Sequence, residues 1–240
     1  MTIAEHVVDV TGLAKDYAGR RVIEGVTLTL APGEMIGLVG ANGGGKTTTL
    51  RMLASLLRPD AGSGTVLGLP LGDRRLRHAI GYMTQRPALY PDLDVIENLR
   101  FRAAAHGVAR PADCIAEVAE NYGITDVLRT RVSALSGGWV RRVQFAATMI
   151  HAPRLLLLDE PTAGLDAATR RDIWGWLAAL ATEGCSIVVS THDLVEAERC
   201  PAILHYHDGR AEGPLSPATL IAQSGQPTLE AAIVAQADSR

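Results

Sequence analysis

Lysine and aromatic residues are scarce in this sequence of 240 residues, where aromatics make up 4%. Only Lys15 and Lys46 are lysines, so nearly every basic side chain is an arginine. The 23 basic and 26 acidic side chains almost cancel. Broad nucleic-acid binding needs clustered positive charge on one face, so we expect no nucleic-acid partner.

Long apolar runs and paired cysteines are also missing. No run approaches the roughly 20 apolar residues that cross a bilayer, and the first residues lack the basic and apolar regions of a signal peptide. The cysteines, Cys114, Cys185 and Cys200, are odd in number and lack C-x-x-C spacing, which fits neither a disulfide framework nor a zinc site. We expect a chain in a reducing compartment, without direct membrane insertion.

The hydrophobic pattern alternates between strands and helices. Residues 7–10 and 22–30 alternate as in an antiparallel β element, whereas residues 35–39, 155–158 and 186–190 are almost continuously apolar. Leucines at helical spacing predict a helix over residues 47–57. Continuous apolar strands that alternate with helices indicate a parallel sheet covered on both faces, so the predicted fold class is α/β.

A glycine-rich turn lies between the apolar strand 35–39 and the helix that follows. Residues 40–47, GANGGGKT, satisfy the phosphate-loop pattern G-x-x-x-x-G-K-[ST], and the strand before and helix after are the context that this pattern requires. Backbone N–H groups and the helix N-terminus can cradle a triphosphate. Lys46 would reach the β and γ phosphates, and Thr47 would bind Mg²⁺. The loop alone indicates binding of a nucleoside triphosphate, and its candidate residues are Asn42, Gly43, Gly44, Gly45, Lys46, Thr47 and Thr48.

Two carboxylates follow the apolar strand 155–158. Asp159 would hold the hydrated Mg²⁺, because ligands bind at the carboxyl edge of open α/β sheets. Glu160, one residue further on, would polarise the attacking water as a general base. The alternative, an acidic turn that caps the next helix, suits one carboxylate better than two.

Further motifs resemble those of the nucleotide-binding subunits of ABC transporters, in the family's order and over essentially the whole chain. The matching segments are Tyr17 as the adenine-stacking aromatic, Gln85 as the Q-loop residue, Leu135-Ser136-Gly137-Gly138-Trp139 as the signature, residues 161–166 as the D-loop with Asp166, and His192 as the switch histidine.

The resemblance implies a P-loop NTPase (RecA-like) parallel-sheet core with an antiparallel β subdomain and a helical subdomain. We expect one nucleotide-binding domain over residues 1–240. Within it, residues 1–85 hold the antiparallel β subdomain and the first part of the core. Residues 86–135 form the helical subdomain, and residues 136–240 form the rest of the core and the C-terminal segment.

The resemblance also implies an ATPase that dimerises head to tail around two ATP molecules. Ser136, Gly137 and Gly138 would contact the γ-phosphate held by the other subunit, a second copy of this chain or another ATP-binding subunit. Gln85 would contact Mg²⁺ and the attacking water, and His192 would hold the γ-phosphate near Glu160. The implied cofactors are ATP and Mg²⁺, and the catalytic residues are Glu160, His192, Gln85 and Lys46.

The chain most resembles the branch that serves multidrug and other exporters with separate permease subunits. We therefore expect a cytoplasmic protein, bound to the inner face of the membrane through a permease that contacts residues 86–106. A soluble ABC ATPase of the translation or DNA-repair class fits less well, because only about 110 residues separate the phosphate loop from Asp159 and leave no room for a coiled-coil arm. An importer subunit stays open.

Trp139 departs from the family pattern, which has glutamine at the end of the signature. An indole offers one N–H donor and no acceptor, so we hypothesise a variant signature that still permits hydrolysis. Trp174 and Trp176 are expected to serve packing. The other six histidines have no motif around them and are assigned no role: His6, His78, His106, His151, His205 and His207.

Overall fold

A computed structural model describes residues 6–238, with the side chains of residues 6–235. Its strands form a four-stranded antiparallel sheet in the order β2-β1-β4-β5 and a six-stranded sheet in the order β10-β9-β3-β8-β7-β6. The strands are β1 (Val8–Tyr17), β2 (Arg20–Leu30), β3 (Met35–Gly40), β4 (Ala61–Val66), β5 (Leu69–Pro70), β6 (Ile80–Met83), β7 (Leu155–Asp159), β8 (Ser186–Thr191), β9 (Ala202–His207) and β10 (Arg210–Leu215).

Helices cover both faces of the larger sheet, in which every neighbouring pair except β9 and β10 is parallel. The α-helices are α1 (Lys46–Leu53), α2 (Leu76–Ala79), α3 (Val95–Ala105), α4 (Pro111–Asn121), α5 (Gly137–Met149), α6 (Ala167–Thr182), α7 (Leu194–Ala197), α8 (Pro217–Ser224) and α9 (Leu229–Asp238). Short 3₁₀ helices span Thr125–Val127 and Val132–Ala134. This architecture is the α/β class that the apolar pattern predicts.

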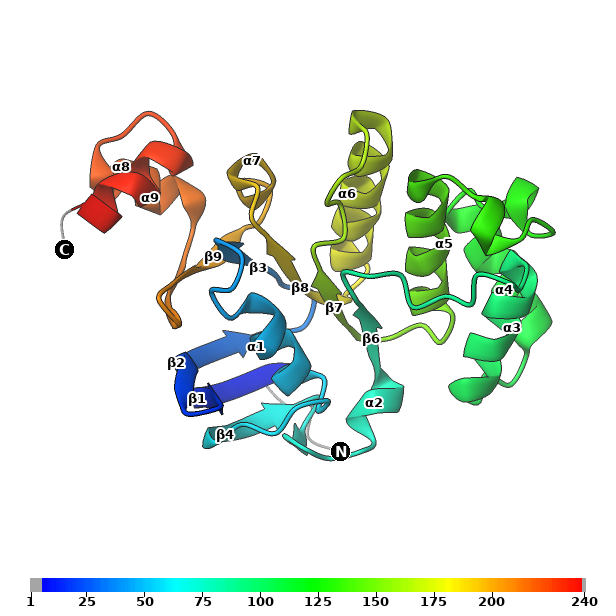
Figure 1. Ribbon diagram of the computed structural model, residues 1–240, viewed down its shortest axis with the longest axis horizontal. Coiled ribbons are helices and arrows are strands. Elements are labelled where there is room, and N and C mark those ends of the chain that lie inside the picture. Colours follow the sequence, from blue (N-terminus) through cyan, green and yellow to red (C-terminus); the bar gives the residue numbers. More distant parts are fainter. Residues whose placement is uncertain (1–5, 239–240) are drawn as a thin grey trace.

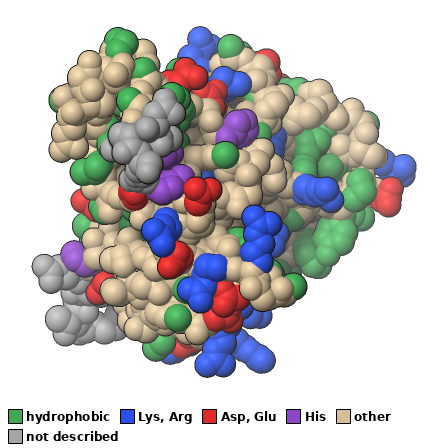
Figure 2. All heavy atoms as spheres, turned by 60° about the vertical axis from the view of Figure 1, so that its left-hand side comes forward, with side chains coloured by type: hydrophobic (Ala, Val, Ile, Leu, Met, Phe, Trp, Pro, Cys, Tyr) green, Lys and Arg blue, Asp and Glu red, His purple; other side chains and the backbone are tan. Residues whose placement is uncertain are grey.

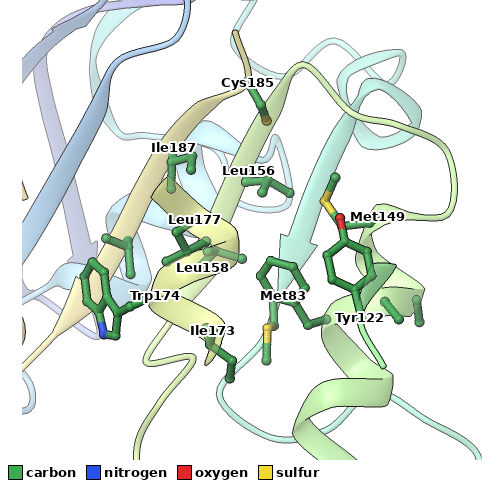
Figure 3. Close-up of a cluster of buried hydrophobic side chains, with 14 of the residues drawn as sticks. Met83, Tyr122, Met149, Leu156, Leu158, Ile173, Trp174, Leu177, Cys185 and Ile187 are labelled. Atoms are coloured by element: carbon green, nitrogen blue, oxygen red, sulfur yellow. The ribbon is translucent and has the colours of Figure 1, made fainter. Parts of the chain in front are cut away.

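The four consecutive leucines of β7 pack alternately into two hydrophobic cores, one on each face of the sheet. Leu155 and Leu157 pack into a cluster with α1 and the antiparallel sheet, and Leu156 and Leu158 pack into a second cluster with α5 and α6. Successive strand residues face opposite sides of a sheet, so a strand that is buried on both faces is apolar at most positions. Figure 3 shows the second cluster, in which Trp174 and Leu177 of α6 lie beside Leu158.

Helices α3, α4 and α5 lie together on the right of Figure 1, beyond β6. Asp94 begins α3 with a capping box, in which its carboxylate accepts the N–H of Glu97 and the Glu97 side chain accepts the N–H of Asp94. Pro111 begins α4, a helix position that suits proline because its backbone nitrogen needs no hydrogen-bond partner there. The division of the chain at residues 85 and 135 stays a prediction, because α5 packs against both α3 and α4 from beyond residue 135.

The predicted helix over residues 47–57 is wrong at its C-terminal end. Helix α1 ends at Leu53, and Ser55 has a φ of 54°, in the left-handed region that terminates a helix. Leu57 therefore packs on the core from the following loop. Within residues 6–238, no helix combines the length and apolar composition that crossing a bilayer requires.

Candidate functional site

The loop between β3 and α1 adopts a backbone that needs glycine. Gly40, Gly43 and Gly45 have φ angles of 144°, 84° and 109°. A Cβ atom on Gly40 would lie 2.2 Å from the carbonyl oxygen of Tyr206, so no side chain fits there. Gly45 immediately precedes α1 and opens the N-terminus of that helix toward the loop.

Lys46 is the first residue of α1 and is almost fully buried. Its Nζ donates to the carbonyl oxygens of Gly40 at 2.6 Å and Ala41 at 3.0 Å. Burial lowers the pKa of this ammonium, and the charges of Glu160 and Asp159 oppose that shift. The loop thus holds a compact cation against its own carbonyl oxygens.

A cavity of about 340 Å³ opens above the loop. The predicted site residues that line it are Asn42, Gly43, Gly45, Lys46, Thr47, Thr48, Gln85 and Glu160. Val22 of β2 also lines this cavity, although the sequence analysis does not single it out. The fold thus brings most of the predicted ATP-binding and catalytic residues into one space.

Asp159 ends β7 beside the start of α1. Its Oδ1 accepts hydrogen bonds from Thr47 Oγ1 at 3.0 Å and Ser190 Oγ at 2.8 Å. Both donors are hydroxyl groups, and Ser190 is completely buried in the neighbouring strand β8. The carboxylate is therefore held in one orientation next to the phosphate loop.

Glu160 has a φ of 48°, which is unusual for a residue with a side chain. Two neighbours hold this backbone: Ser190 Oγ accepts its N–H at 3.0 Å, and Arg141 Nη2 donates to its carbonyl oxygen at 3.2 Å. Arg141 is itself buried and also donates to the carbonyl oxygen of Thr84 at 3.1 Å. The strained conformation turns the Glu160 side chain into the cavity above the loop.

Two predicted catalytic residues meet the Glu160 carboxylate. Gln85 Nε2 donates to Oε2 at 3.1 Å, and His192 Nδ1 lies 3.2 Å from Oε1. Glu160 is buried, whereas the side chain of His192 is half exposed. Two residues far apart in the sequence, Gln85 and His192, therefore converge on the Glu160 carboxylate.

A larger cleft of about 920 Å³ lies on the other side of the loop and is lined by residues that include Gly44, His192 and Val234. Figure 2 shows the side of the molecule that carries β2, β9 and α9, where histidine, basic and acidic side chains are mixed rather than grouped by sign. Within the part of the chain that the structure describes, this face has no extended basic block of the kind that nucleic acid requires.

Six predicted ATP-binding residues do not line the smaller cavity: Tyr17, Gly44, Ser136, Gly137, Gly138 and Asp166. Tyr17 ends β1 with 43% of its surface exposed, and Lys15 Nζ lies 6.0 Å from its ring centroid. Ser136 and Gly137 begin α5 and are exposed. Asp166 caps α6. A hydrogen bond from the backbone N–H of Thr169 lowers the pKa of the Asp166 carboxyl group. In Figure 1, β6 and β7 lie between α1 and α5, so the signature helix is apart from the phosphate loop.

Ser190, Arg141 and Gln144 are site residues that the sequence analysis misses. Gln144 Nε2 donates to the carbonyl oxygen of Thr84, next to Gln85, at 2.9 Å, and Gln144 Oε1 accepts from Arg141 Nη1 at 2.9 Å. Polar residues on a buried strand or helix are a signal of such a role, since buried polar groups need partners. The sequence gives no sign of the role of Ser190, because this residue ends a run of apolar residues that indicates only a buried strand.

The comparison with protein families decides the identity. Residues 23–163 match the family described as ABC transporter, and residues 131–198 also match an AAA domain. This chain belongs to the ABC transporter family. The prediction of an ABC transporter ATP-binding domain is therefore confirmed, and so is the predicted P-loop α/β fold.

Curated relatives of this ABC chain are named for drug transport and export. The multidrug ABC transporter ATP-binding protein YbhF of Escherichia coli (strain K12) is 34% identical, over 97% of this chain and 42% of its own length. The Nod factor export ATP-binding protein I of Paraburkholderia xenovorans (strain LB400) is 39% identical, over 91% of this chain and 73% of its own length. The chain thus spans less than half of the first relative and about three quarters of the second.

Solved structures of the family share the fold over nearly the whole chain. An ATP-binding subunit of an ABC transporter has a TM-score of 0.85 at 27% identity, covering 95% of this chain and 98% of that one. The subunit cbiO1 of Clostridium perfringens, part of the ABC transporter complex cbiONQ, scores 0.82 at 26% identity, covering 91% and 92%. A dimeric ATP-binding cassette in a post-hydrolysis state, bound to ADP and Pi, scores 0.79 at 25% identity, covering 87% and 98%.

Proposed function

We propose that this chain is the ATP-hydrolysing subunit of a membrane exporter that uses separate permease subunits. Two copies would enclose two ATP molecules head to tail, at the inner face of the membrane. The observation that carries the proposal is the Glu160 carboxylate, which Gln85 and His192 contact from two sides in a cavity lined by the phosphate loop.

In this mechanism Glu160 is the general base for the attacking water. A base must lie within hydrogen-bond reach of the proton that it takes, and the Glu160 carboxylate faces the cavity that would hold the γ-phosphate. Gln85 orients one carboxylate oxygen, and His192 lies against the other. Lys46 would exchange the carbonyl oxygens of Gly40 and Ala41 for phosphate oxygens as ATP enters.

The residues at the end of β7 fit a magnesium ion. Thr47 Oγ1 and Asp159 Oδ1 are 3.0 Å apart, and Gln85, whose side chain includes an amide oxygen, lines the cavity above the loop. A hydroxyl, a carboxylate and an amide are the oxygen donors that Mg²⁺ accepts. When bound, Mg²⁺ neutralises charge that develops on the phosphates. Ser190 would keep Asp159 oriented toward the ion.

The position of the signature supports a dimer. Ser136 and Gly137 are exposed at the start of α5, and α5 is separated from α1 of the same chain (Figure 1). The N–H groups at this helix end would bind the γ-phosphate held by a second subunit. The related cassette that is dimeric and bound to ADP and Pi supports the same arrangement. Loss of the γ-phosphate would remove these contacts and open the dimer.

The segment 86–106 carries the surface proposed for the permease. Tyr90 and Phe101 are about half exposed, and their rings meet edge to face with centroids 5.0 Å apart. They line a depression of about 380 Å³ together with Leu89 and Asn98. Exposed aromatic residues in a depression are typical of protein interfaces. The names of the curated relatives favour export as the direction of transport.

Dimer formation tests the enzymatic half of the proposal. In Glu160→Gln, slow hydrolysis should trap an ATP-bound dimer, which light scattering detects as a doubled mass upon addition of ATP. Ser136→Arg in the same background should keep the chain monomeric, whereas Ser133→Arg, also exposed but outside the signature, should not. A chain that stays monomeric with ATP in the Glu160→Gln background would contradict the proposed dimer.

Membrane capture tests the export half. The full chain, immobilised and incubated with detergent-solubilised membranes, should recover a polytopic membrane protein in stoichiometric amount. Recovery of ribosomes or DNA instead would favour the soluble ATPase alternatives and overturn the export proposal.

A further inference from the structure

Glu196 carries a buried carboxylate near His192, and the proposed mechanism gives it no role. It lies on α7, four residues after His192, and only 4% of its surface is exposed. Burying a carboxylate is unfavourable unless hydrogen-bond donors and a balancing charge surround it. The donors around Glu196 therefore show which parts of the chain this carboxylate holds together.

One oxygen of the Glu196 carboxylate joins two chain segments. Its Oε2 accepts a hydrogen bond from Thr162 Oγ1 at 2.7 Å and another from Thr191 Oγ1 at 3.0 Å. Both threonines are almost fully buried, so water does not compete for their hydroxyl groups. Thr162 lies two residues after Glu160, and Thr191 directly precedes His192. A single buried oxygen thus links the segment of the proposed base to the segment of the histidine that contacts it.

The backbone on the other side of His192 is fixed as well. Thr191 Oγ1 accepts the N–H of Asp193 at 3.0 Å, so the hydroxyl that bonds Glu196 also holds the residue after the histidine. The Asp193 carboxylate caps α7 by accepting the N–H groups of Val195 and Glu196. The main chain around His192 is therefore held on both sides, although the side chain itself is half exposed.

The second oxygen of the Glu196 carboxylate faces Arg170 of α6. Oε1 lies 3.3 Å from Arg170 Nε, and Arg170 Nη1 lies 3.4 Å from Asp193 Oδ2. These distances are longer than those from the threonine hydroxyls to Oε2, and the Arg170 side chain is 37% exposed, so solvent screens its charge. The guanidinium balances the charge of Glu196, whereas the hydroxyl groups of Thr162 and Thr191 form the shorter and better shielded link.

We propose that Glu196 is a positioning residue, which holds His192 against the Glu160 carboxylate by joining Thr162 to Thr191. Glu196 lines neither of the two cavities beside the phosphate loop, so it acts through His192 rather than on the nucleotide. A misplacement of about 1 Å at a reacting centre can cost on the order of a hundredfold in rate. The inference rests on the proposed function, because that function gives His192 and Glu160 their parts in hydrolysis.

Two substitutions of Glu196 in the full chain separate the hydroxyl link from the charge. Glu196→Met keeps the length of the side chain and removes both acceptors, so kcat should fall at least about tenfold while ATP affinity stays within about threefold. Glu196→Gln keeps an oxygen that can accept both hydroxyl groups, so its kcat should stay within about threefold of wild type. Equal losses of kcat in the two variants would contradict the hydroxyl link.

Glu198→Gln is the control for these variants, since Glu198 is exposed two residues further on and should keep wild-type turnover. Thermal unfolding and binding of a fluorescent ATP analogue establish that each variant is folded.

Thr162→Val tests the same link if Glu196→Met does not fold. This substitution preserves the shape of the side chain and deletes one of the two hydroxyl donors, so kcat should fall at least about fivefold. Thr182→Val is the control, because the exposed Thr182 also donates one hydrogen bond, to the carbonyl oxygen of Ala178 at the far end of α6. Wild-type kcat in Thr162→Val would contradict the link between the two threonines.

A double-mutant cycle with His192→Ala separates positioning from a general structural effect. A residue that acts only through His192 has no further effect once the imidazole is gone. Glu196→Met and Thr162→Val should therefore each change kcat by less than about twofold in the His192→Ala background. Equal falls in both backgrounds would overturn this inference and leave the proposed function intact. Unchanged kcat in His192→Ala itself would contradict the proposed mechanism, and the inference would fall with it.

Discussion

The Nδ1 atom of His192 lies 3.2 Å from Oε1 of Glu160. The two residues follow neighbouring parallel strands, β8 and β7, whose carboxyl ends meet at one edge of the sheet. The second carboxylate oxygen, Oε2, is already occupied by Gln85. The Glu160 carboxylate is therefore fixed by both oxygens, and only its remaining lone pairs are open toward the cavity.

His192→Ala removes one of these two contacts. We expect kcat for ATP hydrolysis to fall by about two orders of magnitude, because a hydrogen-bonding group at a reacting phosphate is worth that much. ATP affinity should change by less than about threefold. His78→Ala, an exposed histidine away from the phosphate loop, is the control and should keep wild-type turnover. Unchanged kcat in His192→Ala would remove His192 from the mechanism.

Ser190→Ala tests a residue that acts through both carboxylates. Its hydroxyl donates to Asp159 and accepts the N–H of Glu160, so its loss should lower kcat at least about tenfold with little change in ATP affinity. Stability should fall by about 1 to 3 kcal/mol, since a buried N–H loses its acceptor.

Ser186→Ala is the matched control for Ser190→Ala. Ser186 is equally buried on β8, and its hydroxyl makes two comparable bonds, with Ala31 and Gly33, far from the site. The free energy of unfolding in urea should fall by a similar amount in Ser186→Ala as in Ser190→Ala, whereas Ser186→Ala should keep wild-type turnover. Equal losses of kcat in the two variants would show a purely structural effect.

Trp139→Gln restores the residue that is usual for the family at the end of the signature. The Arg142 guanidinium lies 5.7 Å from the Trp139 ring centroid and 5.5 Å from that of Trp176, and it also pairs with Asp172. The substitution removes one cation–π contact, worth about 0.5 to 1 kcal/mol in urea unfolding. Steady-state turnover should stay within about twofold of wild type. A tenfold gain would mean that Trp139 impairs the signature.

Two glycine substitutions test the packing of the core. A Cβ atom on Gly81 of β6 would lie 2.5 Å from Leu156 Cδ2 and 2.8 Å from Pro153 Cγ, so Gly81→Ala should lower the free energy of unfolding by about 1 to 3 kcal/mol. Gly175 in α6 has open space around it, so Gly175→Ala should raise stability by about 0.5 to 1 kcal/mol. Effects of the same sign in both variants would contradict this account of the packing.

The sequence predicts the central strands well, because β3, β7 and β8 are buried on both faces and are therefore mostly apolar. It does not predict β4, β5 or β10, which are mostly exposed or half-buried and carry glycine or proline. It also does not predict β9, in which His205 and His207 interrupt the apolar residues. The end of α1 is misplaced because Leu57 continues the helical spacing while its side chain reaches the core from a loop.

The site is predictable where a residue type is tied to a local motif. Lys46, Asp159 and Glu160 follow apolar strands at motif spacing, and the structure brings them together. The stack of His106 on His151 is invisible in the sequence, because it depends on how α3 and the end of α5 cross in space. Packing between segments that are distant in the sequence does not change the hydrophobic periodicity of either segment, so the sequence does not reveal it.

Steady-state ATP hydrolysis by Glu160→Gln tests the central claim most directly. The substitution keeps the size of the side chain and removes its basicity, while Gln85 and His192 stay in place. The account predicts that ATP binding is retained and that turnover falls at least about a hundredfold, the contribution of a general base. Wild-type turnover in Glu160→Gln would contradict the assignment of the catalytic base and, with it, the proposed mechanism.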